Sequence, residues 1–135
     1  MSRRFCFGVV LFNTATGSGA AETSRRSFQT SDGVTLSFLD AGRNSTGKRN
    51  LTIALIPGWT MPASIWRNQV PAFTRRYHTL AFDPRGQGES EVPTSGYTAE
   101  RRAADIKEFL SPFPNVLLVG WSLGAIESLE YVHLF

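Results

Sequence analysis

Short apolar runs alternate with amphipathic segments along most of the chain. The runs at residues 51–56, 77–82 and 116–120 have the length and the β-branched content of buried strands. Between them, residues 64–73 and 98–110 carry apolar side chains at helical spacing, and the segment after the third run does so again. The order strand, helix, strand, helix, strand, helix predicts a parallel sheet with helices on both of its faces.

A hairpin is predicted ahead of this alternating part. Residues 27–30 and 34–40 read as two extended runs, and Ser31, Asp32 and Gly33 lie between them. An Asp-Gly pair between two such runs is a strong signal for a tight antiparallel turn. The fold class predicted is therefore α/β, with an N-terminal hairpin followed by the parallel part. Residues 41–50 are polar and are expected to be a connecting loop.

The length and the charge of the chain exclude several classes of protein. The 135 residues suffice for one modest domain, and no stretch approaches the roughly 18 apolar residues that a membrane span requires. The formal net charge of +3 comes without a basic stripe or interleaved aromatic residues, which argues against nucleic-acid binding. The sequence carries no indication of an oligomeric state.

Metal and cofactor sites are not expected. The single cysteine, Cys6, can form neither an internal disulfide nor a cysteine-based metal site, and the two histidines have no partners at ligand spacing. Gly86 and Gly88 suggest a dinucleotide-binding loop, but Glu91 stands where the third glycine would be. We therefore expect no cofactor and no metal ion.

The N-terminus resembles a leader rather than part of a domain. Arg3 and Arg4 precede the apolar run at residues 5–12, and small residues follow at 15–21. This order predicts a secretory signal peptide over residues 1–21, and hence a secreted or periplasmic protein. A transit peptide and a disordered leader are the alternatives, and the last would leave the protein in the cytoplasm.

The chemistry of the chain is expected at a Gly-x-Ser-x-Gly motif. Gly120, Ser122 and Gly124 lie between the third strand and the last helix, which is the context of a nucleophile elbow. The chain must reverse sharply there, so Ser122 is expected to be strained and the two glycines are needed to avoid collisions of Cβ atoms. The N–H of Leu123, at the start of the helix, is placed to stabilise an oxyanion.

Three motifs in order resemble the α/β-hydrolase fold family. They are Pro-Gly-Trp at residues 57–59, Asp-Pro-Arg-Gly-Gln-Gly-Glu-Ser at 83–90, and the elbow at 120–124. The resemblance covers residues 28–135 and is closest to small esterases and cofactor-free haloperoxidase-like enzymes. It implies a serine hydrolase that cleaves carboxylic esters of small molecules through an acyl-serine intermediate.

The same resemblance implies roles for individual residues. Ser122 would be the nucleophile, and the backbone N–H groups of Trp59 and Leu123 would form the oxyanion hole, with Gly58 in the oxyanion loop. Pro57 stands where the family usually has histidine, but the donor there is a backbone group. A serine in place of aspartate at position 122 argues against the dehalogenase and epoxide-hydrolase branches, whose ester intermediate forms on a carboxylate.

A serine nucleophile needs a histidine base, and neither histidine is expected to reach Ser122. His133 lies about 16 Å away if both residues flank one helix at about 1.5 Å per residue. His78 begins a strand whose other end faces the site, so both histidines are expected to be surface or packing residues. Glu127 and Glu130 are expected on a solvated face of the last helix.

Only eleven residues follow Gly124, too few for the carboxylate and the histidine that the family places after its serine. We therefore expect an incomplete α/β-hydrolase fold, with residues 22–135 as the N-terminal half of the domain and little or no activity in this chain alone. Two alternatives are a degenerate hydrolase that serves as a binding module, and a haloperoxidase-like enzyme that exchanges acyl groups with peroxide.

Overall fold

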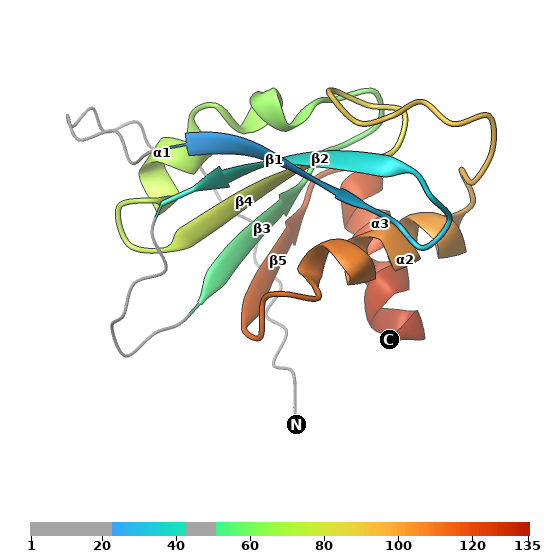
Figure 1. Cartoon of the computed structure of the whole chain (residues 1–135). Helices are drawn as coiled ribbons and strands as arrows, with labels where there is room; N and C mark the ends of the chain where they lie inside the picture. Colours follow the sequence, from blue (N-terminus) through green and yellow to red (C-terminus); the bar gives the residue numbers. More distant parts are fainter. Residues whose placement is uncertain (1–22, 43–50) are drawn as a thin grey trace.

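A five-stranded mixed sheet with helices on both faces forms the body of the chain (Figure 1). The computed structural model describes residues 23–42 and 51–135, so the predicted leader and most of the polar loop lie outside the described residues. The elements are β1 (Thr23–Gln29), β2 (Thr35–Ala41), β3 (Thr52–Ile56), the 3-10 turn η1 (Ala63–Trp66), α1 (Gln69–Phe73), β4 (His78–Asp83), α2 (Ala99–Leu110), β5 (Val116–Gly120) and α3 (Leu123–Leu134).

The predicted hairpin is confirmed at the start of the sheet. Strands β1 and β2 pair antiparallel, with Gln29 opposite Thr35 at the turn. Gly33 has a φ of 86° in that turn, a conformation that a residue without a side chain adopts at little cost. The hairpin joins the rest of the sheet through β2, which pairs antiparallel with β4.

The remaining strands run parallel, as the alternating pattern predicts. Strand β3 lies between β4 and β5 and pairs parallel with both, giving the order β1-β2-β4-β3-β5. The carboxyl ends of the three parallel strands therefore meet at one edge, where Ile56 is in register with Gly120. Loops that leave these strand ends are brought together in space, and this edge is where a site is expected.

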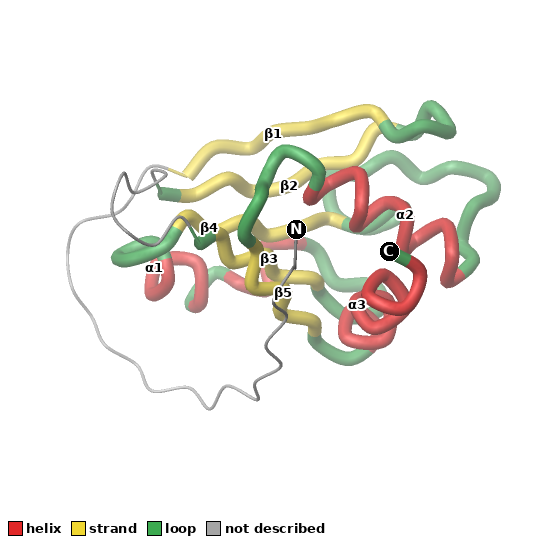
Figure 2. Tube along the Cα trace, turned by 90° about the horizontal axis from the view of Figure 1, so that it is seen from below, coloured by secondary structure: helices red, strands yellow, loops and turns green. Residues whose placement is uncertain are grey.

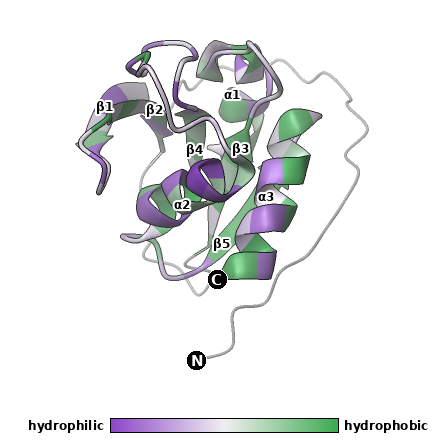
Figure 3. Ribbon diagram, turned by 90° about the vertical axis from the view of Figure 1, so that its right-hand side faces the viewer, coloured by the Kyte–Doolittle hydropathy of each residue, from purple (hydrophilic) through white to green (hydrophobic). Residues whose placement is uncertain are grey.

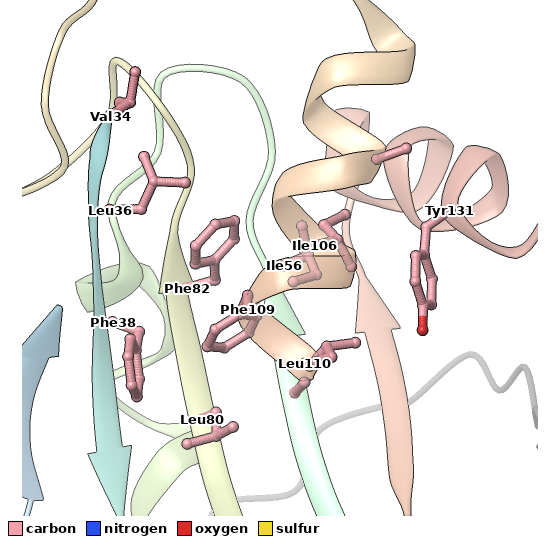
Figure 4. Packing of buried hydrophobic residues seen from close by; sticks show 12 residues of the cluster. Val34, Leu36, Phe38, Ile56, Leu80, Phe82, Ile106, Phe109, Leu110 and Tyr131 are labelled. Atoms are coloured by element: carbon pink, nitrogen blue, oxygen red, sulfur yellow. The ribbon is translucent and has the colours of Figure 1, made fainter. Parts of the chain in front are cut away.

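Helices cover the sheet on two sides (Figure 2). Helices α2 and α3 cover one face, where the rings of Phe82 and Phe109 stack with centroids 4.5 Å apart and Phe38 packs on Phe109 (Figure 4). The turn η1 and helix α1 cover the other face, where Trp66 and Val70 pack on side chains of β3 and β4. The prediction of helices on both faces is confirmed.

The sequence of helix α2 contains the signals that begin a helix and stabilise its two ends. The hydroxyl of Thr98 accepts a hydrogen bond from the N–H of Arg101 and so caps the helix. Glu100 in the first turn and Lys107 in the last turn have the charges that the helix dipole favours. The predicted apolar face is buried on the sheet and includes Ile106.

The prediction of one continuous helix at residues 64–73 is wrong. The chain instead forms η1 and then the five-residue helix α1, with a break at Arg67 and Asn68. Pro71 gives the reason, because it has no N–H to donate to the carbonyl of Arg67 and its ring crowds that carbonyl. A continuous helix through residue 71 would lose that hydrogen bond and would have to bend there.

The β5 edge differs from the expected buried strand. Among the described residues β5 pairs only with β3, and all five of its residues are half-buried. Beside it, α3 carries exposed apolar side chains, and Figure 3 shows hydrophobic stretches along this helix. These exposed side chains are Ile126, Leu129, Leu134 and, at the end of the helix, Phe135. The strand was predicted correctly, and it is only half-buried because β3 is its one neighbour in the part of the sheet that the structure describes.

Candidate active site

Ser122 lies at the sharp turn between β5 and α3. Its backbone has a φ of 55° and a ψ of −122°, and the residue is exposed at the start of the helix. A non-glycine residue in such a conformation costs on the order of 1–3 kcal/mol, so the surrounding structure must impose it. The side chain does not cap the helix and makes no hydrogen bond with any described residue. The predicted strain is therefore present, and the hydroxyl is not occupied by a structural contact.

The two glycines of the motif are required by backbone packing. A Cβ on Gly120 would lie 2.5 Å from the carbonyl oxygen of Gly124, within the turn itself. A Cβ on Gly124 would lie 2.4 Å from the carbonyl oxygens of Ile56 and Pro57, at the end of β3. Real side chains do not reach such distances, so Gly120 allows the turn to close and Gly124 allows it to pack on the neighbouring strand.

The loop after β3 lies directly against the serine. A Cβ built on Gly58 would be 3.1 Å from Cβ of Ser122 and 3.6 Å from its Oγ. The N–H of Trp121 donates to the carbonyl of Ile56 at 3.0 Å, which holds the elbow to the end of β3. The structure thus brings two of the three sequence motifs together, as the parallel order of the strands predicts.

The two predicted oxyanion donors both have unused N–H groups. Neither the N–H of Trp59 nor that of Leu123 donates a hydrogen bond to any residue that the structure describes. Leu123 is the first residue of α3, where an N–H has no partner within the helix. Backbone donors left free beside a nucleophile are the groups that can stabilise an anionic oxygen.

The third motif, residues 83–90, packs against the chain segment that follows β3 and holds it in place. The buried carboxylate of Asp83 accepts from the N–H of Ala63 and from Arg25, each at 2.5 Å. Gly88 has a φ of 55°, and a Cβ there would lie 2.1 Å from Oδ1 of Asp83. The side chain of Gln87 contacts the loop at residues 58–61. The motif is recognisable in the sequence, but the contact that Gln87 makes with residues 58–61 is not.

A buried ion-pair network continues from the same loop. Arg85 donates to both carboxylate oxygens of Asp105 on α2, at 2.6 and 2.7 Å, and to Asp32 in the hairpin turn, at 3.1 and 3.2 Å. Hydrogen bonds from Arg85 and from Thr30 lower the pKa of Asp32 to about 2. The two carboxylates raise the pKa of Arg85 further above its ordinary value, although burial opposes the shift. The network ties the hairpin turn, the third motif and α2 together.

Glu127 corrects the expectation of a solvated helix face. Its carboxylate is buried between α2 and α3 and pairs with Arg102, while Glu130 is partly exposed. Burial raises the pKa of Glu127, although the charge and hydrogen bond of Arg102 oppose this shift. The expectation failed because α2 packs on α3 and removes this face from water.

Neither histidine contacts Ser122. His78 is buried at the amino end of β4, where Nε2 lies 2.7 Å from Oδ1 of Asp40 and Nδ1 lies 3.2 Å from the hydroxyl of Thr52. Burial alone would raise the pKa of Asp40, but hydrogen bonds from Arg26 and His78 lower it. His133 is exposed in the last turn of α3. His78 is therefore a packing residue rather than a surface one.

Two further properties concern residues 23–42 and 51–135 only. No helix there is both long and apolar enough to cross a membrane. Within the same ranges, no three or more histidine, cysteine or acidic side chains are grouped so that they could hold a metal ion. The expectation that the protein uses no metal and no cofactor stays a prediction.

Comparison with known proteins shows which family the chain resembles. Residues 53–134 match the Alpha/beta hydrolase family. The chain is 36% identical to a soluble epoxide hydrolase of Corynebacterium sp. over 44% of its length, and 30% identical to a non-heme chloroperoxidase of Streptomyces lividans over 76% of its length. It is also 36% identical to a pimeloyl-[acyl-carrier protein] methyl ester esterase of Methylococcus capsulatus over 63% of its length.

A solved structure has a similar fold, and all of the proteins compared are longer than the part that matches this chain. The structure of Cfl2 from Burkholderia cenocepacia superposes with a TM-score of 0.72 at 28% identity, over 82% of this chain and 36% of that chain. The matching part spans 21%, 37% and 32% of the epoxide hydrolase, the chloroperoxidase and the esterase, respectively.

Proposed function

The chain belongs to the alpha/beta hydrolase family, and from that premise we propose that it is part of a serine hydrolase that cleaves carboxylic esters of small molecules. One observation carries the proposal. Ser122 is strained and exposed, its side chain makes no hydrogen bond with any described residue, and the Gly58 loop lies against it. A hydroxyl without a structural contact, next to unused backbone donors, is suited to attack a carbonyl group.

The reaction follows from the roles proposed for these groups. The Oγ atom of Ser122 attacks the carbonyl carbon while a base accepts its proton, and the N–H groups of Trp59 and Leu123 bind the oxyanion that forms. The intermediate collapses to an acyl-serine and releases the alcohol, which takes a proton from the protonated base. Water then attacks the acyl group while the base accepts a proton from it, and the bond to Oγ breaks as the base returns that proton to Ser122, which releases the acid.

The base and its carboxylate are proposed to come from outside the described residues. Neither histidine of the described chain contacts Ser122, and a serine hydroxyl is a weak nucleophile near neutral pH without a base. Residues 22–135 would then be the N-terminal half of the hydrolase domain. The half-buried β5 edge and the share of each relative that the chain covers support this division. The leader at residues 1–21 is proposed to direct the protein out of the cytoplasm.

A serine at position 122 favours an ester over an epoxide as the substrate. At the same identity, the sequence likeness to the Corynebacterium epoxide hydrolase covers 44% of this chain and the likeness to the methyl ester esterase covers 63%. Solved epoxide hydrolase structures match as much as 84% of the chain, so the serine itself is the observation that favours an ester. The likeness to a chloroperoxidase, over 76% of the chain, favours a second candidate, the peroxide-dependent exchange of acyl groups. Release of peracid from acetate and hydrogen peroxide would distinguish this candidate from simple ester hydrolysis.

A fluorophosphonate probe tests the proposal. In the full-length protein we expect the probe to label Ser122 covalently, and we expect the Ser122→Ala variant to remain unlabelled. This chain alone should react far more slowly, because the proposed base is outside it. An unlabelled full-length protein would leave the non-catalytic binding module as the better interpretation, and rapid labelling of this chain would contradict the proposed origin of the base.

A further inference from the structure

The loop that follows β3 has a backbone conformation that its own sequence does not favour. Thr60 has a φ of 59°, in the left-handed region that a β-branched residue rarely adopts. Its hydroxyl donates to the carbonyl of Trp59 at 2.7 Å, a contact that stays within the loop. Contacts from another part of the molecule are therefore needed to hold this conformation.

One side chain, that of Gln87, provides such contacts. Its Oε1 accepts from the N–H of Thr60 at 2.8 Å, and its Nε2 donates to the carbonyls of Gly58 and Met61 at 3.3 and 3.2 Å. A single carboxamide thus pairs with one donor and two acceptors across four successive residues. Glutamate at this position would lack the donor, and asparagine would be one methylene too short.

Gln87 is itself held firmly. The residue is 7% exposed, its N–H donates to the carbonyl of Pro84 at 2.9 Å, and its carbonyl accepts from the N–H of Ser90 at 3.1 Å. The adjacent Gly88 packs so closely on Asp83 that no side chain fits there. The carboxamide is therefore presented by a rigid loop, not by a mobile surface residue.

The loop that Gln87 holds is the one that borders the nucleophile. Gly58 lies against Ser122, and the next residue, Trp59, carries one of the two proposed oxyanion donors. We propose that Gln87 is a positioning residue for ester hydrolysis, which keeps residues 57–61 in the conformation that directs the Trp59 N–H toward the oxyanion. This inference depends on the serine-hydrolase function proposed above.

A kinetic experiment on the full-length protein tests the catalytic part of this inference. Gln87→Glu keeps the size and the acceptor but removes the donor, and it should lower kcat by about 10- to 100-fold because the loop shifts. The KM should change by less than about threefold, since the substrate's ground state does not depend on the oxyanion donors. Glu89→Gln is the matched control, because it makes the reverse exchange at an exposed position two residues away.

The rates are compared per folded molecule, so that a loss of stability is not mistaken for a loss of kcat. An unchanged kcat in Gln87→Glu would overturn the inference. An equal fall in kcat in the Glu89→Gln control would also overturn it, because the effect would not be specific to the carboxamide.

Hydrogen exchange on the full-length protein tests the loop separately from activity. Gln87→Met removes all three contacts, so the amide of Thr60 should exchange at least about tenfold faster, while amides in β4 keep their rates. If this variant does not fold, the exchange rate of the Thr60 amide is measured in Gln87→Asn instead, because its shorter carboxamide cannot reach the loop. An unchanged Thr60 rate would overturn the inference even if the enzyme were active. A faster Thr60 rate in a protein without any esterase activity would instead count against the proposed function, and against the catalytic role with it.

Discussion

The loop at residues 83–90 contacts the loop that lies against Ser122, and the β5–α3 edge carries Ser122 itself, but the two are built in opposite ways. In the loop, polar side chains are buried and paired, as Asp83, Arg85 and Gln87 are. At the edge, apolar side chains such as Ile126 and Leu129 are exposed. The loop resembles a protein interior, where paired polar groups fix the positions of the side chains. The edge resembles a surface on which further structure can pack.

The first prediction compares a core residue with an edge residue and has the largest expected effect. Phe109 is 2% exposed and stacks on Phe82, so Phe109→Ala should lower the free energy of unfolding by about 3–5 kcal/mol. Ile126 is 61% exposed in this chain, so in this chain alone Ile126→Ala should change the free energy of unfolding by less than about 0.5 kcal/mol. Urea unfolding of both variants gives the two values, and similar losses would contradict the comparison.

A second prediction compares two glycines. Gly124→Ala places a Cβ 2.4 Å from two carbonyl oxygens of the neighbouring strand, and it should cost about 3 kcal/mol or more. Gly33→Ala is the control, because its Cβ would meet nothing within 4 Å and only the positive φ is strained. The control should cost about 1 kcal/mol. Thermal unfolding ranks the two, and a larger loss in Gly33→Ala would show that the elbow is not packed as described.

A third prediction uses pH to test the ion-pair network. The pKa of Asp32 is lowered from 3.8 to about 2, so its contribution is present above pH 4 and is lost as the pH falls toward 2. Because the Asp32 side chain is 37% exposed, solvent screening limits this contribution to about 1 kcal/mol. Asp32→Asn should be less stable by that amount at pH 7, and the difference should shrink as the pH falls through 2 and vanish near pH 1. An undiminished difference near pH 1 would mean that the ionised carboxylate is not its cause.

A fourth prediction has the smallest effect on stability and concerns the edge. Ile126→Gln combined with Leu129→Gln should change the free energy of unfolding by less than about 0.5 kcal/mol per site, because both side chains already contact water. The double variant should associate less at high concentration, since it removes part of an exposed apolar patch. Sedimentation velocity at several concentrations measures this. A large loss of stability would show that these side chains are buried in solution.

The parts of the fold that depend on local pattern could be predicted from the sequence. The hairpin at Asp32-Gly33, the parallel strand order and the two glycines of the elbow follow from turn chemistry, periodicity and the space available for a Cβ atom. The break before α1 could also have been predicted, because proline is tolerated only in the first turn of a helix and Pro71 is the third residue of α1.

The parts that depend on distant partners could not be predicted. Gln87 contacts residues 26 to 29 positions away, and nothing in its own segment indicates that its carboxamide faces the oxyanion loop. Glu127 was expected in water because its position on the helix favours a polar face. It is buried because Arg102, on another helix, offers it a charged partner. Such pairings arise from the packing of elements, which periodicity does not specify.

The central claim is that Ser122 forms a covalent acyl intermediate, and one measurement tests it most directly. The full-length protein is mixed with p-nitrophenyl acetate, quenched with acid within the first turnover, and analysed by peptide mass spectrometry. We predict that the peptide containing Ser122 gains the mass of one acetyl group, and that the Ser122→Ala protein gains none there. Ester cleavage without an acetylated Ser122 peptide, or with the acetyl group on another residue, would contradict the account.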